Sequence, residues 1–393
     1  MGSRTNAGSL RRLLDTLLLV AFVAALAMPA AVMTMGPRGG DVAVTGEKLA
    51  PLPSLPRGGR AWAELPGGLR AWFRDRFGLR QLLIHWNAKL QVHALGVTSS
   101  PQVVLGRDRW LYYAGERNVE DYRAVDPFSA SDLEKYRVAI EHWHAFLDAR
   151  GIPLVLVVAP NKSTVYPEHL PAWMTRVGPE TRTDQLVRHL RERSGIEVLD
   201  LRPWVIEAKT WGPPLFFRTD THWNALGAFA GYRGLATRLA TIFPRVRVPE
   251  AAEYELRIHP APGGDMARFL ALPELDDEAV SLVPATPAPD RGAGAEAQAK
   301  LQDMRYVSRG ATDRAGAPIV RALIFHDSFA GALMPYLGDL FGHAEYRWSR
   351  KFDYDLVERE HPEVVVFEVV ERALMAWTPD PPPEQPAGAS AAR

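Results

Sequence analysis

Two short segments of the chain carry residue types that could act together as a serine nucleophile and its base. Asp220 and His222 lie two residues apart in FRTDTHWNALG, and Ser328 lies in HDSFAG. A serine hydroxyl is inert at neutral pH unless a base takes its proton, and that base must itself be oriented. The residue types therefore predict Ser328 as the nucleophile, His222 as the base and Asp220 as the group that orients the second ring nitrogen of His222.

The segment around Ser328 also has the surroundings that a nucleophile needs. HDSFAG directly follows an apolar run, residues 319–325, and precedes a stretch with the pattern of a helix. Such a strand-to-helix turn exposes a hydroxyl and places backbone N–H groups beside it, where they can stabilise an oxyanion. The backbone N–H of Ser328 is the donor that the sequence identifies.

Each of these residues has a simpler interpretation as well. A carboxylate and an imidazole are ordinary zinc or iron ligands, in which case the other ligands would have to come from residues such as His326 and Asp327. Asp220 could instead cap the helix that starts near Asn224, and Ser328 could be an N-cap. We favour the catalytic interpretation because no spaced His/Glu motif supports a metal and all three residues fall at strand ends. Neither a metal nor another cofactor is expected.

The elements around these residues alternate in the pattern of a parallel α/β fold. Continuous apolar runs at 153–160, 319–325 and 363–370 are typical of strands buried on both faces. Alternation of such strands with helices favours a three-layer sandwich, in which sites lie at the carboxyl ends of the strands. The expected helices run from the capping-box spacing of Ser131 and Glu134 to Gly151, over 181–192, over 224–242, and from Ser328 to Leu340. Shorter strands are expected at 196–201 and on either side of a tight turn within 103–113.

Three further side chains stand where they could contact a substrate. Lys162 and Tyr166 follow the strand at 153–160, so they could line the mouth of a cleft or, equally, be a solvated lysine and a packed tyrosine. Tyr336 lies eight residues after Ser328, about two helical turns on, and could reach a substrate or pack in the core.

Two more candidates flank the predicted strand ends. Asp327 stands beside Ser328, where it could contact a substrate, although ordering the turn is the simpler role. Arg372 follows the last strand, where an ion pair with its neighbour Glu371 is the simpler expectation.

The N-terminus indicates export. Arg4, Arg11 and Arg12 precede Thr16–Met35, an uncharged run that is long enough to span a bilayer. Basic residues before such a run keep the N-terminus in the cytoplasm and send the remainder outward. Residues 1–35 are therefore predicted to be a cytoplasmic tip and an uncleaved membrane anchor. A signal peptide cleaved near Ala25–Ala27 is the alternative.

Composition sets the remaining boundaries. Gly- and Pro-rich residues 36–68 are expected to form a linker, residues 69–376 the catalytic domain with an insertion at about 249–314, and residues 377–393 a disordered tail.

The chain has 46 basic and 46 acidic residues, so its overall charge does not attract nucleic acid, and nucleic acid is not expected as a partner. The absence of cysteine excludes disulfides, thiolate metal sites and a cysteine nucleophile.

These motifs together resemble the alginate O-acetyltransferase family, the AlgJ/AlgX-like proteins, whose catalytic domain is a variant of the SGNH hydrolase fold. The similarity covers about residues 70–375, and its order is unusual: ordinary SGNH enzymes place serine early and D-x-x-H late, whereas here D-x-H precedes the serine. The matching segments are LGRDRWLYY, KSTVYPE, RTDTHWNALG, the DSF of HDSFAG, and EVVVFEVVER.

The resemblance implies a function and a setting. It implies a single-span protein of the inner membrane whose periplasmic domain acetylates a secreted or surface polysaccharide through an acetyl-serine at Ser328. It also implies that an integral-membrane acyltransferase supplies the acetyl groups. A periplasmic acetylesterase and a non-catalytic scaffold of an export complex are the alternatives.

Overall fold

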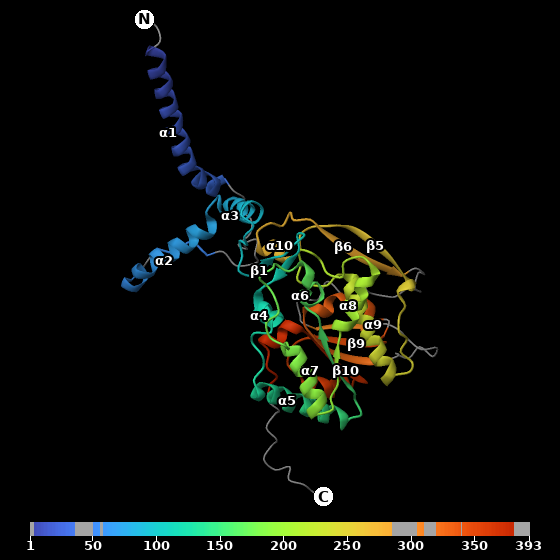
Figure 1. Cartoon of the computed structure of the whole chain (residues 1–393). Helices are drawn as coiled ribbons and strands as arrows, with labels where there is room; N and C mark the ends of the chain where they lie inside the picture. The colour runs from blue at the N-terminus through green and yellow to red at the C-terminus, as the bar shows by residue number, and fades with distance from the viewer. Residues whose placement is uncertain are drawn as a thin grey trace. The chain divides into compact units, whose positions relative to one another are not determined.

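The computed structural model describes residues 4–35, 50–55, 58–284, 305–309, 320–338 and 340–380. The chain divides into two compact units, residues 1–96 and 97–393 (Figure 1). The first unit is helical, with α1 (Arg4–Met35), α2 (Gly59–Arg76), α3 (Arg80–Lys89) and a π-helical turn (Leu90–Ala94).

Helix α2 begins inside the range that was predicted to be a linker. Pro66 and the glycines around it suggested irregular structure. Trp62 and Leu65, however, have the same helical spacing as the apolar residues from Leu69 onward. Periodic apolar positions therefore override the local breakers here. The other linker residues 36–49 and 56–57 lie outside the described residues.

The second unit is built on a six-stranded sheet of order β4-β3-β10-β8-β9-β7. Its neighbouring strands are parallel, except that β7 runs antiparallel to β9. All seven residues of β10 are buried, as its continuous apolar run predicts. The strands are β3 (Leu154–Ala159), β4 (Val198–Asp200), β7 (Arg305–Arg309), β8 (Arg321–His326), β9 (His343–Trp348) and β10 (Val364–Val370).

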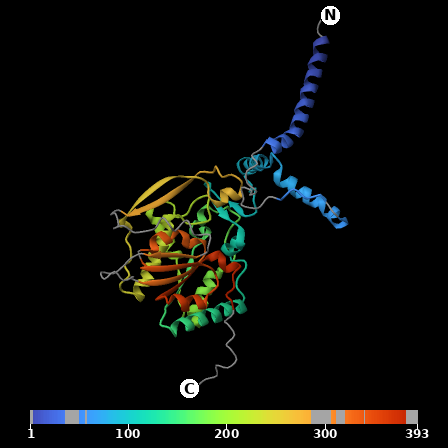
Figure 2. The same ribbon diagram turned by 180° about the vertical axis from the view of Figure 1, so that it is seen from behind.

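Helices cover both faces of this sheet, which confirms the predicted three-layer fold (Figure 2). On one face, Leu235 of α9 lines a small cavity with Val366 of β10. On the other face, the Trp143 ring of α5 lies 4.9 Å from the ring of Phe367. Val366 and Phe367 are consecutive, so their side chains point to opposite faces. The helices of this unit are α4 (Asn118–Arg123), α5 (Ala130–Asp148), α6 (Lys162–Val165), α7 (Arg182–Arg193), α8 (Arg202–Glu207), α9 (Ala225–Ile242), α10 (Asp265–Phe269), α11 (Met334–Leu337) and α12 (Tyr354–Glu360).

Two helix predictions are corrected at their ends. Helix α5 is capped by Ser129, whose hydroxyl accepts from the backbone N–H of Asp132 at 3.1 Å, so the expected Ser131 box is wrong by two residues. After β8, a 3₁₀ turn (Ser328–Ala332) and the short α11 replace the expected long helix. Pro335 has no N–H to donate, so it cannot continue a helix that begins at Ser328.

The predicted insertion contains an antiparallel hairpin. Strands β5 (Tyr254–Ala261) and β6 (Asp277–Pro284) pair along their whole length, and α10 lies in the connection between them. Residues 285–304 of the insertion and residues 381–393 of the predicted tail lie outside the described residues. The short strands β1 (Val103–Leu105) and β2 (Leu111–Tyr113) form the expected hairpin near the start of the unit.

Candidate active site

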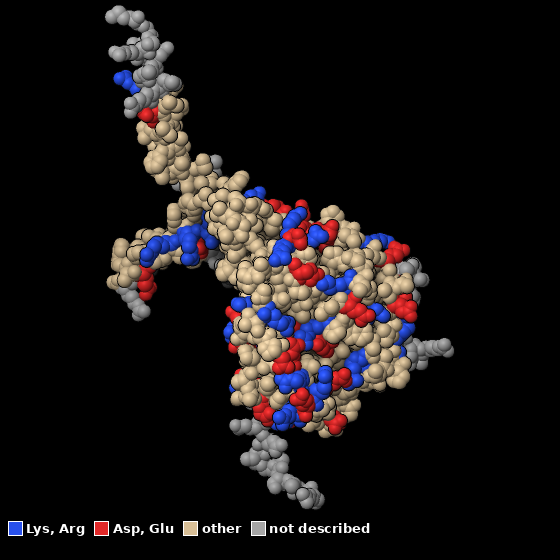
Figure 3. Space-filling model, in the orientation of Figure 1, with Lys and Arg blue, Asp and Glu red and all other residues tan. Residues whose placement is uncertain are grey.

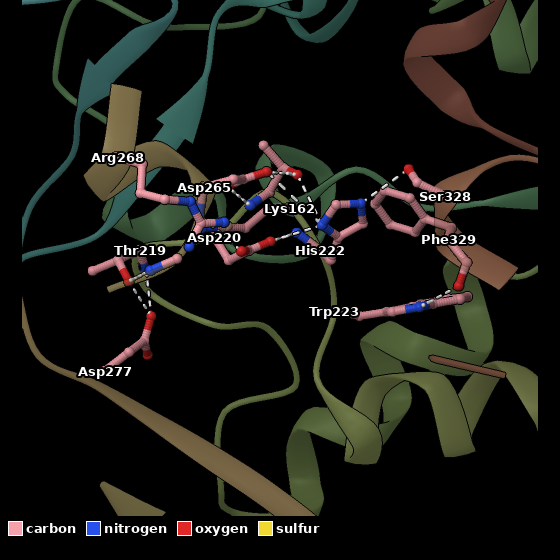
Figure 4. Close-up of polar contacts among 12 residues, drawn as sticks. Lys162, Thr219, Asp220, His222, Trp223, Asp265, Arg268, Asp277, Ser328 and Phe329 are labelled. Carbon is pink, nitrogen blue, oxygen red and sulfur yellow. Dashed lines mark hydrogen bonds and ion pairs between the residues drawn. The ribbon is translucent and has the colours of Figure 1, made fainter. Parts of the chain in front are cut away.

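Ser328, His222 and Asp220 form a continuous line of hydrogen bonds (Figure 4). The Ser328 hydroxyl lies 2.9 Å from Nε2 of His222, and Nδ1 of His222 lies 2.7 Å from Oδ1 of Asp220. Ser328 lies two residues after the end of β8, whereas Asp220 and His222 lie in the segment before α9. The structure therefore brings the three predicted residues together at the carboxyl end of the sheet, in the order that base catalysis requires.

Hydrogen bonds hold Asp220 as a carboxylate. Its Oδ1 also accepts from the backbone N–H of His222 at 3.1 Å, and its Oδ2 accepts from the backbone N–H of Asp265 at 2.9 Å. Burial alone would raise the pKa of Asp220, but the hydrogen bonds and the His222 ring lower it to about 2. Asp220 is therefore ionised at any physiological pH and can hold the N–H of His222 in place. It does not cap α9, because Asn224 does so.

A second carboxylate, Asp265, lies beside the same ring nitrogen and was missed by sequence reasoning. Asp265 accepts from the backbone N–H of Thr221 at 2.8 Å and from the Thr221 hydroxyl at 2.7 Å. The Thr221 oxygen in turn lies 3.1 Å from Nδ1 of His222. Asp265 sits in the β5–β6 connection, where no motif or spacing marks it, so only the folded structure could identify it.

The same three side chains could in principle bind a metal ion. Asp220, His222 and Asp265 each offer a ligand atom, and these atoms lie within 4.8 Å of one another. Their four carboxylate oxygens, however, all accept hydrogen bonds from N–H or O–H groups of neighbouring residues. Such donors orient the carboxylates toward protein groups, so the arrangement favours the hydrogen-bonded line over a metal centre.

The turn that presents Ser328 is fixed by Asp327. One oxygen of Asp327 accepts from the backbone N–H of Phe329 at 3.0 Å, and the other accepts from the backbone N–H of Val370 at 2.9 Å. Asp327 is only 3% exposed. It therefore orders the turn, which was its simpler expected role, and has no surface to offer a substrate.

Trp223 ties the two active-site segments together. Its indole N–H donates to the backbone carbonyl of Phe329 at 3.0 Å. The Phe329 ring also lies 5.2 Å from the ring of His222. One residue next to the base thus contacts one residue next to the nucleophile, which fixes the distance between the two segments.

Lys162 is buried rather than placed at a cleft mouth. Its ammonium group donates to the carbonyls of Leu111 at 2.7 Å and Arg218 at 3.1 Å. Lys162 thereby links the β2 strand to the segment that leads into Asp220. The predicted contact with a substrate is not supported, because Lys162 is only 4% exposed.

The two predicted tyrosines are also core residues. The Tyr166 hydroxyl accepts from the backbone N–H of Leu215 at 2.9 Å, and the Tyr336 hydroxyl donates to the carbonyl of Ala225 at 3.1 Å. Both side chains are buried. Each tyrosine thus packs in the interior and uses its polar end on backbone, so neither is placed to bind a substrate.

Arg372 and Glu371 do not pair with each other, so that expectation was wrong. Glu371 lies 3.5 Å from Arg202, whereas Arg372 lies 3.1 Å from Glu116. The two neighbours lie in the 3₁₀ turn Glu371–Met375 that follows β10, and their side chains contact different partners. The Arg372 guanidinium lies 5.0 Å from the centre of the Phe329 ring, so it supports the nucleophile turn and is itself buried.

The burial of Lys162 predicts a pH-dependent stability. Loss of hydration lowers the pKa of Lys162 from 10.5 to about 7, although Asp220 and other carboxylates oppose that shift. Between these values the unfolded chain binds a proton that the folded chain does not, so the free energy of unfolding should rise with pH across this window. Thermal melting of the full chain in detergent at pH 7 and pH 9.5 should show this rise in the wild type and a smaller one in Lys162→Met. The partly exposed Lys209→Met is the matched control, and an unchanged slope in Lys162→Met would contradict the assignment.

Gly264 predicts a steric test of the site. A Cβ atom on Gly264 would lie 2.4 Å from Cβ and 2.5 Å from Oδ2 of Asp220, which is too close for any real contact. Gly264→Ala should therefore displace Asp220 and reduce activity roughly 10- to 100-fold, because small displacements in a catalytic line cost that much. In the nucleophile turn, Gly331 has open space where its Cβ would stand, so Gly331→Ala should keep near wild-type rates. Equal rates for both variants would show that the position of Asp220 does not matter.

The three-layer sheet and the hydrogen-bonded residues at its carboxyl end define an SGNH hydrolase-like domain. Residues 103–304 match the family model described as SGNH hydrolase-like domain, acetyltransferase AlgX. This match spans about half of the chain, so the chain belongs to the AlgX-type family of SGNH hydrolase-like acetyltransferases, as the sequence motifs indicated. The matched range includes Asp220 and His222 and ends before Ser328.

Individual relatives agree with this family. The probable alginate O-acetylase AlgJ of Pseudomonas fluorescens is 34% identical over 178 residues, which are 44% of this chain and 43% of that protein. AlgJ of Pseudomonas aeruginosa is 30% identical over 223 residues, 55% of this chain and 52% of that protein. The chain thus spans about half the length of the curated relatives it matches.

Two solved structures are also similar. The O-acetyltransferase domain of Pseudomonas putida AlgJ is 21% identical, covers 70% of this chain and 93% of that one, and superposes with a TM-score of 0.44. Bacillus cereus PatB1, with a sulfonyl adduct, is 17% identical, covers 71% of this chain and 100% of that one, and superposes with a TM-score of 0.48.

Proposed function

We propose that this protein is an O-acetyltransferase that acetylates hydroxyls of a secreted or cell-surface polysaccharide. The observation that carries the proposal is the line of hydrogen bonds from Asp220 through His222 to Ser328. Membership of an acetyltransferase family makes acetyl transfer the reaction that this line would serve. The proposal includes an acetyl donor that acylates Ser328 and a polysaccharide hydroxyl that accepts the acetyl group.

The first half of the proposed reaction forms an acetyl-serine. Nε2 of His222 takes the proton of the Ser328 hydroxyl while the oxygen attacks the carbonyl carbon of the acetyl donor. The negative charge that develops on the carbonyl oxygen is stabilised by the backbone N–H of Ser328. The imidazolium then gives its proton to the leaving group, and the bond between the acetyl carbon and the donor breaks.

The second half delivers the acetyl group to the sugar. A sugar hydroxyl occupies the place of the departed donor, and His222 removes its proton as it attacks the acetyl-serine. The bond between the acetyl carbon and Ser328 breaks, and the serine oxygen regains its proton from His222. In both halves Asp220 stabilises the positively charged ring and fixes its tautomer.

We also propose that the domain works on the periplasmic side of the inner membrane. Among the described residues, α1 holds one segment, Arg12–Met33, that is long and apolar enough to cross a bilayer. An integral-membrane acyltransferase would then supply acetyl groups near the anchor. Lys and Arg are interspersed with Asp and Glu on the face shown in Figure 3.

Covalent labelling tests the proposed reaction. The full chain in detergent would be incubated with an activated acetyl ester and examined by intact mass, with and without an oligosaccharide acceptor. We expect an adduct of one acetyl group on Ser328 that passes to the sugar. Loss of the adduct to water alone would identify an acetylesterase, and a folded protein that forms no adduct and releases no acetate would leave the scaffold as the function.

A further inference from the structure

The first unit carries a hydrophobic surface that the proposed reaction does not use. On α2, five apolar side chains follow each other at helical spacing: Trp62, Leu65, Leu69, Trp72 and Phe73. At 100° per residue they fall on one side of the helix. Trp62 is 61% exposed and Phe73 is 51% exposed. A stripe of this kind normally faces a hydrophobic environment, so its exposure indicates an occupant.

Helix α3 continues the same pattern. Leu82, Leu83, Trp86 and Leu90 fall on one side of the helix and its extension, and each of them is more than half exposed. We name these nine residues of α2 and α3 the α2–α3 apolar stripe. Scattered exposed apolar residues are common on proteins, but a contiguous row of large ones over two helices marks a binding surface.

The two helices carry more basic than acidic residues. Residues 62–95 contain five Arg and Lys against two Asp and Glu. Arg70 and Arg74 lie on the side of α2 away from the stripe, and Arg74 pairs with Asp75 at 3.1 Å. Aromatic and leucine side chains on one face with arginines on the other are the signature of helices that lie in the headgroup region of a bilayer.

The turn between the two helices lies at the end of the membrane segment. A Cβ atom on Gly78 would stand 2.6 Å from the carbonyl oxygen of Pro29 and 2.7 Å from Cβ of Val32. Both residues belong to the last turns of the Arg12–Met33 segment. Where that segment leaves a bilayer, the α2–α3 turn must therefore be at the depth of the lipid headgroups.

We propose that α2 and α3 form an interfacial membrane anchor, with the α2–α3 apolar stripe inserted among the acyl-chain ends and the arginines beside anionic lipid headgroups. The inference rests on the proposed membrane span. The α2–α3 apolar stripe would be covered by the outer face of the same bilayer. Such an anchor would hold the chain that leads into the catalytic unit at the membrane surface, where acetyl groups from a membrane donor would arrive.

The absence of cysteine makes a direct test possible, because any single cysteine is a unique labelling site. Leu69→Cys and Leu83→Cys place a fluorophore on the stripe. Gly67→Cys and Gln81→Cys place the same fluorophore on the opposite sides of α2 and α3, and Gly67 has open space for a side chain. Each full-length variant would be reconstituted into vesicles with and without phosphatidylglycerol, then exposed to nitroxide-labelled lipid or to aqueous iodide.

We expect the stripe labels to lose roughly half or more of their fluorescence to shallow nitroxide lipids, because interfacial helices insert only about 5–10 Å. The control labels should instead be quenched by iodide. Iodide quenching at all four positions would overturn the proposal, and so would stripe labels shielded from both quenchers, since protein would then cover the stripe. Equal quenching by nitroxide lipid with and without phosphatidylglycerol would show that anionic headgroups are not needed, and that part of the proposal would be rejected.

The same vesicles separate this inference from the proposed function. Retention of the chain after an alkaline wash reports whether α1 spans the bilayer, and acetyl transfer to a sugar reports the reaction. The label positions are judged on quenching alone. An active, retained protein with iodide-accessible stripe labels would leave the proposed function in place and reject the interfacial anchor.

Discussion

Ser328→Ala should abolish both the acetyl adduct and the transfer of acetyl groups, with a loss of roughly 10⁴-fold or more, because loss of a nucleophile removes the covalent route altogether. The variant should fold normally. The hydroxyl of Ser328 bonds His222, but the turn is held by Asp327 and by the indole of Trp223, which remain. Intact mass after incubation with an activated acetyl ester measures the adduct, and product analysis with an oligosaccharide measures transfer.

Ser349→Ala is the matched control for this prediction. Ser349 follows β9, and its hydroxyl contacts only the nearby backbone of Lys351, so its removal should change neither activity nor folding. Undiminished acetylation of the polysaccharide by cells that carry only the Ser328→Ala protein would contradict the proposed reaction. Such a result would assign the chain a scaffolding function instead.

Asp220→Asn should have the second-largest effect, a loss of roughly 10³- to 10⁴-fold in kcat. The amide would keep the size of the side chain but remove the charge that stabilises the imidazolium, and its NH₂ could favour the wrong tautomer of His222. Because the pKa of Asp220 is about 2, the wild-type carboxylate is ionised throughout any practical pH range. The loss in Asp220→Asn should therefore persist at every pH from about 5 to 9, which a pH profile of kcat would check.

Asp265→Asn supplies the comparison that makes this prediction specific. Asp265 accepts from the hydroxyl of Thr221 and lies 3.9 Å from Nδ1 of His222, farther than Asp220 at 2.7 Å. Its loss should therefore cost roughly tenfold, as expected of a positioning residue. Equal losses in the two variants would show that both carboxylates act directly on the ring. A double variant no slower than Asp220→Asn alone would show that Asp265 acts through Asp220.

The central line of the site could be predicted from sequence because its members follow simple rules of position. Ser328 follows an apolar strand, which places it at the carboxyl edge of the sheet, and Asp220 and His222 lie in the loop before a helix that Asn224 caps. The resemblance to a known family independently selected the same residues. Buried strands β3, β8 and β10 were predictable as well, since a short, continuous apolar run between turn residues is typical of a strand covered on both faces.

The supporting residues could not be predicted because their roles depend on contacts between distant segments. Asp265 meets Thr221 only when the β5–β6 hairpin folds back over the site. Lys162 was expected at the surface because lysine rarely lies in a core, yet two backbone carbonyls accept from its ammonium group. Strand β9 was missed because its polar residues His343, Glu345 and Arg347 alternate with apolar ones, so it lacks the continuous apolar run that marks the other strands.

The place of β10 in the sheet gives the chain an order of maturation. This strand is the last in the sequence, yet it lies between β3 and β8 and joins the two halves of the sheet. The backbone N–H of Val370 in this strand also donates to the carboxylate of Asp327, which orders the turn that presents Ser328. Because the chain emerges from its N-terminus, the nucleophile turn cannot be completed until the final strand has been delivered and inserted. A growing or half-exported chain would thus be inactive, and a chain truncated before residue 364 would remain inactive.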